Sequence, residues 1–517
     1  MKATKYLALL SLFIGIANAS QNEVLTEQGQ IEGFRKDGMV QFLGIPYAKA
    51  PVDSLRWMPP VKPPKHKGVF KATKFGSQCI QEQYLGDFAK AGGSEDCLFL
   101  NVYVKEKDDS KKKPVFVWIH GGATQVGAGS DYDPSLLVKD GNTIVVTFNY
   151  WLGAFGFVSI DGIDKEKDNN INYGFMDQSL LLSWVQENIE AFGGDKNNVT
   201  IAGESSGAHG VYSHIVSPVS KGKFQYAIAM SGANVINKYP NVAGAITKEA
   251  TRQKGNAFAK ALGCDTNDTV CLRSKSSDEL LKAQAPYMVN TPIIDENFIP
   301  MSYAEAFKTG KINKVTLING NNLDEGDFFS GTIETMTGKI IKDQDYENII
   351  KDLYGDKAKA VLKEYDLDKY VNAAEAYGAA FTDSVFACPA MRINEVLSSK
   401  IPVYSYEFAD RTAPSYLGEL SLVTRAAHTY EIPYIFKGFN GSTNRDTTLN
   451  KLQKPLSKFM ISVWSDVKHI NTKHKDWKQF DKEKRNTLSI ALPNPRMTYK
   501  RFNIAHKCEF WNSLGIY

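Results

Sequence analysis

The chain has 517 residues, of which 43% are hydrophobic, 23% charged and 11% aromatic, a composition typical of a globular protein with a large core. This composition excludes a mainly disordered chain and a collagen-like repeat. The formal net charge is +4 at pH 7, and a nearly neutral chain lacks the electrostatic signature of a nucleic-acid-binding protein. Length alone would allow two or three domains.

The N-terminus has the features of a secretory signal peptide. Residues 1–19 begin with Lys2 and Lys5, continue with an apolar stretch and end in the small-x-small signal Ala17-Asn18-Ala19. The apolar stretch is shorter than the roughly 20 residues that span a bilayer. We expect residues 1–19 to be removed, leaving an exported protein, periplasmic or secreted, with 59 basic and 57 acidic residues. The mature chain should contain no integral membrane segment.

Six cysteines in an exported chain favour disulfide bonds. Cys264 and Cys271 flank a turn-like segment that a local bridge would close, and Cys79 and Cys97 could close a glycine-containing loop. The remaining two cysteines would then form a long-range bond, although many other pairings are open to six cysteines. Free buried thiols are the alternative. A zinc site is less favoured, because no C-x-x-C or Cys/His pair has metal-ligand spacing, and we expect no metal.

Alternating strand and helix patterns between about residues 114 and 232 predict the fold class. Short apolar strands are expected at 114–119, 143–148, 198–202 and 226–230, and a helix with apolar residues near a 3.6-residue period at 179–189. Continuous apolar strands separated by helices indicate a mostly parallel sheet with helices on both faces. We therefore predict an α/β fold.

Later segments extend this pattern toward the C-terminus. Further strands of the same sheet are expected at 315–318 and 403–408, whereas 233–310 and 334–400 are mostly helical in pattern. The sequence contains no internal repeat, low-complexity tract or linker. We therefore expect residues 20–517 to form a single α/β domain with helical insertions.

A candidate nucleophile lies in Gly203-Glu204-Ser205-Ser206-Gly207, between the strand expected at 198–202 and a plausible helix from Ala208. This is the context of a nucleophile elbow, a sharp strand-to-helix turn that exposes a serine above the sheet. Small residues two positions before and after the serine relieve crowding in such a turn. Ser205 fits this frame, whereas Ser206 does not. The motif by itself is weak evidence in a chain with 40 glycines, and its position strengthens it.

An ester-cleaving serine needs a base, and in α/β-hydrolases the histidine follows the acid along the chain. Four histidines lie beyond the acidic candidates. His469 and His474 lie among lysines, and His506 is two residues before a cysteine. His428 precedes the apolar-aromatic segment 432–436, as a histidine near a buried site would, and it is the favoured base.

Two acidic residues and a glycine loop complete the candidate site. Asp324 and Glu325 follow the strand expected at 315–318, and the pattern does not separate them as the acid that orients the histidine. His120-Gly121-Gly122-Ala123 follows the strand at 114–119. Glycines let backbone N–H groups approach an oxyanion closely. An ordinary glycine turn is the alternative for this loop, but the four signals occur in the expected order.

The segment 192–207, FGGDKNNVTIAGESSG, closely resembles the serine signature of the type-B carboxylesterase/lipase family, which includes the cholinesterases. The segment 95–102, EDCLFLNV, resembles the second signature of that family. Shorter similarities occur at 44–48, 55–57, 152–157 and 172–178, and the resemblance extends from about residue 24 to the C-terminus.

The resemblance implies an α/β-hydrolase fold and a serine esterase that works through an acyl-enzyme intermediate without a metal or organic cofactor. It implies that Ser205 is the nucleophile, Glu325 rather than Asp324 the acid, and His428 the base. It further implies oxyanion donors at Gly122, Ala123 and Ser206, with Gly121 shaping the loop, and the disulfide bonds Cys79–Cys97, Cys264–Cys271 and Cys388–Cys508.

Several positions depart from the family pattern. Ala123 stands where many members have glycine, and a positive φ there would strain the backbone. Ser206 replaces the usual alanine and keeps its N–H. The loop before Cys97 contains no tryptophan, whereas cholinesterases bind choline with a tryptophan there, so a dedicated cholinesterase is disfavoured. Phe328 and Phe329 match aromatic residues of the cholinesterase gorge and are expected to line a substrate pocket.

These observations together predict a secreted serine carboxylesterase that acts on a small-molecule or lipid ester. Two alternatives remain at this point: a lipase that acts on long-chain esters, and a non-catalytic adhesion protein of the same family. The presence of every part of the catalytic set disfavours the adhesion protein.

Overall fold

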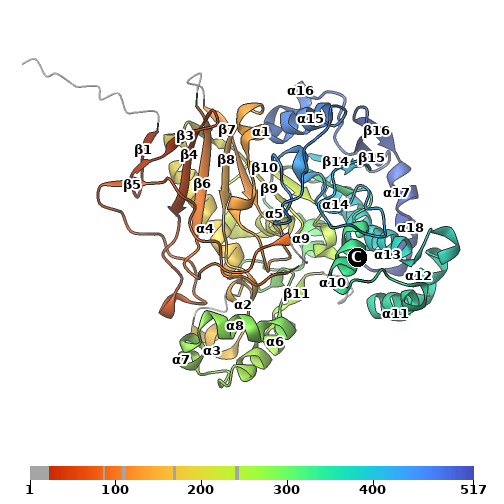
Figure 1. Cartoon of the computed structure of the whole chain (residues 1–517), viewed down its shortest axis with the longest axis horizontal. Helices are drawn as coiled ribbons and strands as arrows, with labels where there is room; N and C mark the ends of the chain where they lie inside the picture. The colour runs from red at the N-terminus through yellow and green to blue at the C-terminus, as the bar shows by residue number, and fades with distance from the viewer. Residues whose placement is uncertain (1–21, 85–87, 107–111, 167–170, 239–243) are drawn as a thin grey trace, which may run out of the picture.

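A mixed sheet of eleven strands forms the centre of the molecule (Figure 1). The computed structural model describes residues 22–84, 88–106, 112–166, 171–238 and 244–517. Residues 1–19, for which we expect removal as a signal peptide, lie outside the described residues.

The sheet order is β16-β15-β14-β13-β10-β9-β7-β8-β6-β4-β3. The strands are β3 (Phe34–Lys36), β4 (Met39–Pro46), β6 (Phe99–Lys105), β7 (Lys113–Ile119), β8 (Ile144–Phe148), β9 (Gly194–Glu204), β10 (Tyr226–Met230), β13 (Thr316–Asn322), β14 (Val403–Phe408), β15 (Asn486–Ile490) and β16 (Arg496–Tyr499). The seven strands from β15 to β8 pair in parallel, whereas β3, β4, β6 and β16 pair antiparallel. The predicted α/β fold with a mostly parallel sheet is confirmed.

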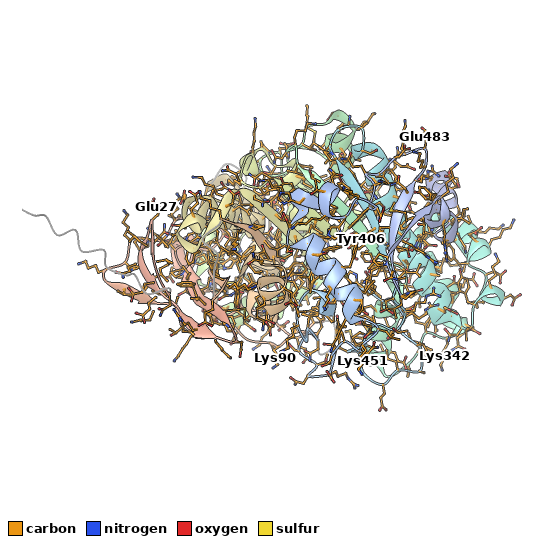
Figure 2. The ribbon with its side chains drawn as sticks, turned by 90° about the horizontal axis from the view of Figure 1, so that it is seen from above. Glu27, Lys90, Lys342, Tyr406, Lys451 and Glu483 are labelled. Atoms are coloured by element: carbon orange, nitrogen blue, oxygen red, sulfur yellow. A yellow bond between two sulfur atoms is a disulfide. The ribbon has the colours of Figure 1, made fainter. Side chains whose placement is uncertain are left out.

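The inner strands are buried on both faces, as their continuous apolar sequences predicted. In β7, Val115, Val117 and Ile119 pack into one hydrophobic cluster, while Phe116 and Trp118 pack into the other. Successive side chains of a strand point to opposite faces, so each face of the sheet has its own core. Figure 2 shows Tyr406 of β14 in the interior of the molecule, where it is fully buried.

Helices cover both faces of the sheet. On one face α1 (Ser135–Lys139) packs on β6 and β8 and contacts α15 (Lys454–Trp464). On the other face α5 (Ser206–Val216) packs on β7, β9 and β10, and α14 (Cys388–Leu397) packs on β13 and β14. The helices α4 (Tyr173–Asn188) and α9 (Tyr303–Thr309) contact α5 in the same layer.

Helical insertions follow β10 and β13, where the sequence predicted mostly helical segments. They comprise α6 (Lys248–Ala261), α7 (Thr269–Ser274), α8 (Ser277–Gln284), α10 (Gly326–Thr337), α11 (Asp343–Tyr354), α12 (Ala358–Glu364) and α13 (Ala373–Phe381). The remaining elements are β1 (Glu23–Thr26), β2 (Gly29–Glu32), β5 (Val69–Lys71), β11 (Ile246–Thr247), β12 (Ile293–Ile294), α2 (Gly153–Gly156), α3 (Asp161–Glu166), α16 (Ile470–Lys473), α17 (Arg501–Ala505) and α18 (Cys508–Leu514). None of the helices among the described residues has the length and apolarity needed to cross a membrane.

The cysteines form three disulfide bonds, Cys79–Cys97, Cys264–Cys271 and Cys388–Cys508. All six cysteines are used, so the pairing implied by the family resemblance is confirmed and the alternative of free thiols is wrong. The second bond joins the turn after α6 to α7, and the third joins α14 to α18. The third bond therefore fixes the C-terminal helix to the layer that packs on the sheet.

Candidate active site

The turn from β9 to α5 places Ser205 in a conformation that few residues adopt, with φ 58° and ψ −126°. The two glycines of the motif make this turn sterically possible. A Cβ at Gly203 would lie 2.5 Å from the carbonyl carbon of Gly207, and a Cβ at Gly207 would lie 2.1 Å from the carbonyl oxygen of Ile119. The predicted nucleophile elbow therefore forms, and both glycines are required by close backbone contacts.

Ser205 and His428 line the same cavity, which has a volume of about 250 Å³. The apolar residues that line it are Phe88, Phe328, Phe329, Phe381, Val385 and Phe386. The other lining residues are Tyr84, Gly122, Ala123, Glu204, Ser206, His209, Ser231, Asn234, Asn290 and Thr429. The sequence predicted Phe328 and Phe329 as pocket residues, and the structure places both there. The cavity thus brings a hydroxyl, an imidazole and an apolar surface together.

The imidazole of His428 is held by a buried carboxylate. Its Nδ1 lies 2.6 Å from Oε2 of Glu325, and Glu325 is fully buried. The other carboxylate oxygen, Oε1, accepts hydrogen bonds of 2.6 Å from the Ser231 hydroxyl and from the Asn322 N–H. Because Nδ1–H donates to Glu325, a neutral imidazole has its lone pair on Nε2, as a general base requires.

Of the two acidic residues that the strand pattern left open, only Glu325, the one that the family resemblance implied, contacts the histidine. Asp324 instead accepts two hydrogen bonds of 2.8 Å from the Arg411 guanidinium and one of 3.3 Å from the Ala426 N–H. Asp324 therefore ties the strand end to the loop that carries His428, and Glu325 orients the imidazole.

Two further buried carboxyl groups lie near the proposed triad, and the sequence did not predict either. Oε1 of Glu204 lies 3.1 Å from Nε2 of His428, and Asn322 donates a hydrogen bond to Glu431. Burial raises the pKa of Glu204 well above its usual range, and the negative charge of Glu325 raises it further. Burial likewise raises the pKa of Glu431, with contributions from Glu204 and Glu325. The signal that could have pointed to Glu204 is its position immediately before the candidate nucleophile Ser205.

The glycine loop carries unused backbone donors. Within the described part of the chain, the N–H groups of Gly122, Ala123 and Ser206 donate no hydrogen bond. The Ser206 hydroxyl accepts a hydrogen bond of 3.0 Å from the Thr124 N–H, which ties the loop to the elbow. A Cβ at Gly121 would lie 2.8 Å from the Glu204 carbonyl oxygen. An oxyanion hole is built from backbone N–H groups of this kind.

Ala123 has a φ of 56°, which lies in the left-handed region. The backbone strain expected for a positive φ at this alanine is therefore present. Gly122 has a φ of 106°, and a Cβ there would lie 2.2 Å from the Val126 carbonyl oxygen. The loop therefore requires glycine at position 122 and holds alanine under strain at position 123.

Aromatic rings surround the imidazole on its other side. The ring centroids of Phe386, Phe329 and Phe328 lie 4.9, 5.2 and 5.7 Å from that of His428. A second histidine in the cavity, His209, pairs through Nε2 with Oδ1 of Asn234 at 2.9 Å. Burial lowers the pKa of His209 to about 4, so this imidazole is neutral near pH 7. Nothing in the sequence pointed to His209 beyond its position one helical turn after the serine.

The histidines that the sequence disfavoured have other surroundings. His469 is paired with Asp466, and His474 contacts the Ser462 hydroxyl. His506 is buried between two carboxylates, with Nδ1 2.6 Å from Asp383 and Nε2 2.7 Å from Glu407. None of these three lines the cavity that contains Ser205.

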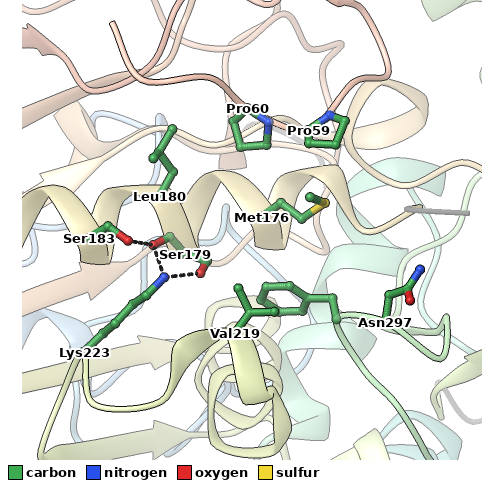
Figure 3. A pocket seen from close by; sticks show the side chains of 10 residues that line it. Pro59, Pro60, Met176, Ser179, Leu180, Ser183, Val219, Lys223 and Asn297 are labelled. Atoms are coloured by element: carbon green, nitrogen blue, oxygen red, sulfur yellow. Dashed lines mark hydrogen bonds between the residues drawn. The ribbon is translucent and has the colours of Figure 1, made fainter. Parts of the chain in front are cut away.

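A larger cavity of about 430 Å³ lies against α4, and Figure 3 shows Met176 and Leu180 on that helix facing Pro60, with Lys223 below. The Lys223 ammonium donates to the carbonyl and hydroxyl oxygens of Ser179, at 3.1 and 2.8 Å. The described residues that line this cavity include no histidine and no carboxylate. It therefore lacks a base for nucleophilic catalysis, despite its size. No group of three or more potential ligand side chains arranged to hold a metal occurs among the residues described.

Known proteins resemble this chain over most of its length. The model of the carboxylesterase family matches residues 20–511. The chain is 32% identical over 502 residues to para-nitrobenzyl esterase of Bacillus subtilis (strain 168), which covers 92% of this chain and 97% of that protein. It is 34% identical over 484 residues to acylcarnitine hydrolase of Mus musculus, with 86% and 83% coverage, and 30% identical over 514 residues to cocaine esterase of Homo sapiens, with 92% and 87%. A solved thermophilic PNB esterase superposes with a TM-score of 0.79 at 29% identity, covering 95% of this chain and all of that one.

Proposed function

The chain belongs to the carboxylesterase family of serine hydrolases, which cleave carboxylic esters, and we propose that Ser205, His428 and Glu325 are its catalytic triad. The observation that carries the proposal is the 2.6 Å contact between His428 Nδ1 and the buried Glu325 carboxylate, in the wall of the cavity that Ser205 enters. The adhesion alternative is disfavoured, because a non-catalytic member would have no need of this buried arrangement.

In the proposed acylation step, the Ser205 hydroxyl attacks the ester carbonyl while His428 Nε2 accepts its proton. Glu325 keeps the imidazole in the required tautomer and stabilises the imidazolium that forms. The proton then passes from His428 to the leaving alcohol, and the acyl group remains on Ser205. Water repeats the attack in the second half of the reaction, and the carboxylic acid is released.

The tetrahedral intermediates of both steps carry an oxyanion, which the N–H groups of Gly122, Ala123 and Ser206 are proposed to bind. Their lack of other hydrogen bonds within the described residues supports this assignment. Loss of one such donor typically costs about 2.7–4 kcal/mol of transition-state stabilisation. The donors are backbone groups on a loop and an elbow held by close contacts, so they need no reorganisation when the charge develops.

The cavity favours a small, neutral ester. Its volume of about 250 Å³ lies just below the range of roughly 300–1,000 Å³ for pockets that bury drug-sized ligands, and one wall is aromatic. Relatives of this chain are named for a p-nitrobenzyl ester and for cocaine, both of which contain aryl groups. We therefore propose short-chain aryl esters as substrates, with a long-chain lipase as the alternative.

The decisive experiment compares wild type with Ser205→Ala on p-nitrophenyl esters of increasing acyl length, below and above their solubility limits. Wild type should hydrolyse short-chain esters below that limit, and Ser205→Ala should be folded and essentially inactive. Activity retained in Ser205→Ala would overturn the triad. A rate that rises only above the solubility limit of long-chain esters would instead identify a lipase.

We further propose that the protein is exported. The basic start, short apolar stretch and Ala17-Asn18-Ala19 ending support cleavage after Ala19. Expression of the full chain in a bacterial host, followed by N-terminal sequencing of protein from the periplasm or medium, should give Ser20 as the first residue. An intact N-terminus on protein retained inside the cell would contradict the proposal.

A further inference from the structure

The small net charge of the chain conceals a strong separation of charge. Residues 451–517 contain 14 lysines and arginines and 5 aspartates and glutamates, a net charge of +9. Residues 1–450 contain 47 basic and 52 acidic residues, a net charge of −5. Such an asymmetry between parts of a chain is a signature of binding to an anionic surface or polymer. The basic segment includes β16, the edge strand of the sheet, and α17 beside it (Figure 1).

One part of this segment is a corner formed by the short strand β16 and the start of α17. We define the β16–α17 corner by Arg496, Tyr499, Lys500, Arg501 and Ile504, all of which are exposed. Residues 484–508 around it contain no aspartate or glutamate. No side chain among the described residues pairs with any of the three cations of the corner. The nearby Arg485 and Lys507, in contrast, are paired with Glu395, Glu509 and Glu364.

The corner also exposes two large apolar side chains. Ile504 is 78% exposed and Tyr499 is 57% exposed, and four residues separate them along the chain. An isolated exposed leucine or isoleucine needs no explanation. Here, however, the isoleucine and the tyrosine share the corner with three cations that pair with no side chain among the described residues. Basic and apolar or aromatic side chains together are the residue combination that binds the interface of a membrane.

We propose that the β16–α17 corner docks the protein on a surface of anionic phospholipid. Arg496, Lys500 and Arg501 would contact lipid phosphates and carboxylates, while Ile504 and the Tyr499 ring enter the headgroup region. The opposite charge of the remaining chain would turn the corner toward the surface and the acidic part away from it. This docking is independent of the catalytic residues, since none of the five residues lines the cavity that contains Ser205.

The apolar side chains favour a lipid over a nucleic acid. A phosphate polymer would attract the three cations equally, and a tyrosine could stack on a base. An exposed isoleucine gains nothing against a phosphate backbone, whereas burial of its side chain in a bilayer interface removes apolar surface from water. Ile504 is thus the residue whose contribution separates the two classes of partner.

The test is sedimentation of the full protein with vesicles of pure phosphatidylcholine or of phosphatidylcholine with about a third phosphatidylglycerol. Each basic residue near an anionic surface contributes about 1 kcal/mol, so Lys500→Glu with Arg501→Glu should lower the partition coefficient by at least about tenfold. Ile504→Ser should lower it severalfold. The control is Lys65→Glu with Lys67→Glu, which makes the same charge change at exposed positions next to β5, on the opposite side of the molecule in Figure 1.

Three outcomes would support the proposal: binding to the anionic vesicles only, weaker binding at high salt, and loss in the corner variants with the control unchanged. An absence of vesicle binding, or an equal loss in the control, would overturn it. Binding to duplex DNA in place of vesicles, unaffected by Ile504→Ser, would also overturn it. Ester hydrolysis measured on the same preparations shows that each variant is folded, and its loss in Ser205→Ala leaves vesicle binding unaffected.

Discussion

Glu204, the residue immediately before Ser205, lies with its Oε1 3.1 Å from Nε2 of His428. This is the nitrogen that must accept the serine proton in the proposed mechanism. Burial raises the pKa of Glu204 well above its usual range, and the negative charge of Glu325 raises it further. When Nε2 gains a proton, Oε1 of Glu204 lies where it can accept from Nε2–H, and Glu204 can therefore stabilise the imidazolium that forms in the transition state.

Glu204→Gln should lower kcat by about tenfold with little change in KM, because an amide oxygen is a weaker acceptor for an imidazolium than a carboxyl group that can ionise. The variant keeps the shape of the side chain, so its thermal unfolding should match that of wild type. Steady-state kinetics on a short-chain p-nitrophenyl ester checks this. An unchanged kcat would show that Glu204 is structural.

Glu325→Gln and Asp324→Asn should separate the two adjacent acids. Loss of the carboxylate that holds His428 should lower kcat by about 10³–10⁴-fold, as expected when the histidine loses its orienting acid. Asp324→Asn removes the ion pair with Arg411 and should cost about 1–3 kcal/mol of stability while kcat falls far less. Measurements of kcat and of urea unfolding on both variants show which acid orients His428. A larger loss of kcat in Asp324→Asn than in Glu325→Gln would identify Asp324 as the triad acid.

The oxyanion loop offers a second matched pair. In Gly122→Ala the new Cβ would lie 2.2 Å from the Val126 carbonyl oxygen, so the loop must move and kcat should fall by about 10²–10³-fold. Ala123→Gly keeps the N–H and relieves about 1–2 kcal/mol of left-handed backbone strain. The greater flexibility of glycine in the unfolded chain lowers the stability by about 0.5–1 kcal/mol and so offsets part of this gain. Its kcat and stability should therefore stay close to those of wild type, and a large loss of activity would argue against the loop geometry.

His506 should make the stability of the protein depend on alkaline pH. Burial disfavours its charge, but the carboxylates of Asp383 and Glu407 outweigh burial and raise its pKa to about 10. Because folding raises the pKa of His506, its protonation stabilises the folded protein. This stabilisation is fully present below the pKa of the unfolded chain, about 6.5, and is lost as the pH rises toward 10. His506→Gln should therefore destabilise by about 3–5 kcal/mol near pH 6, and the difference from wild type should shrink toward pH 10. A pH-independent difference in urea unfolding would contradict this account.

Phe386 should limit the length of the acyl or alcohol group. Its ring lies 4.9 Å from that of His428 and stacks on Phe329. Phe386→Leu removes part of the aromatic wall, so the acyl chain length with the highest kcat/KM should increase by a few carbons. The p-nitrophenyl ester series measures this shift. An unchanged optimum would mean that another wall sets the limit.

Much of the fold was predictable because its signals are local. Apolar runs occur at β7, β8, β9, β10 and β14, which are buried on both faces. Such strands can be recognised from their own sequence, without knowing which strands lie beside them. The strands at the two ends of the sheet, β3, β4 and β6 at one end and β15 and β16 at the other, were not predicted. They are antiparallel or short, and what makes them strands is the partner beside them. The start of α4 at Tyr173 rather than at residue 179 was missed for the same reason, since its first turn packs within the structure.

The sequence by itself determined the chemistry available to this protein. It located the serine elbow and the glycine loop, because both depend on small residues at fixed local spacings. The strand pattern did not separate Glu325 from Asp324, and only the family resemblance favoured Glu325. The tertiary structure shows the contact with His428 that distinguishes the two, because this contact joins residues 103 positions apart. It also brought Glu204, Ser231 and Glu431 around the triad, and it gathered three cations at the β16–α17 corner within a chain of small net charge. Local spacing fixes which backbone turns can form, whereas packing of the sheet decides which distant side chains meet.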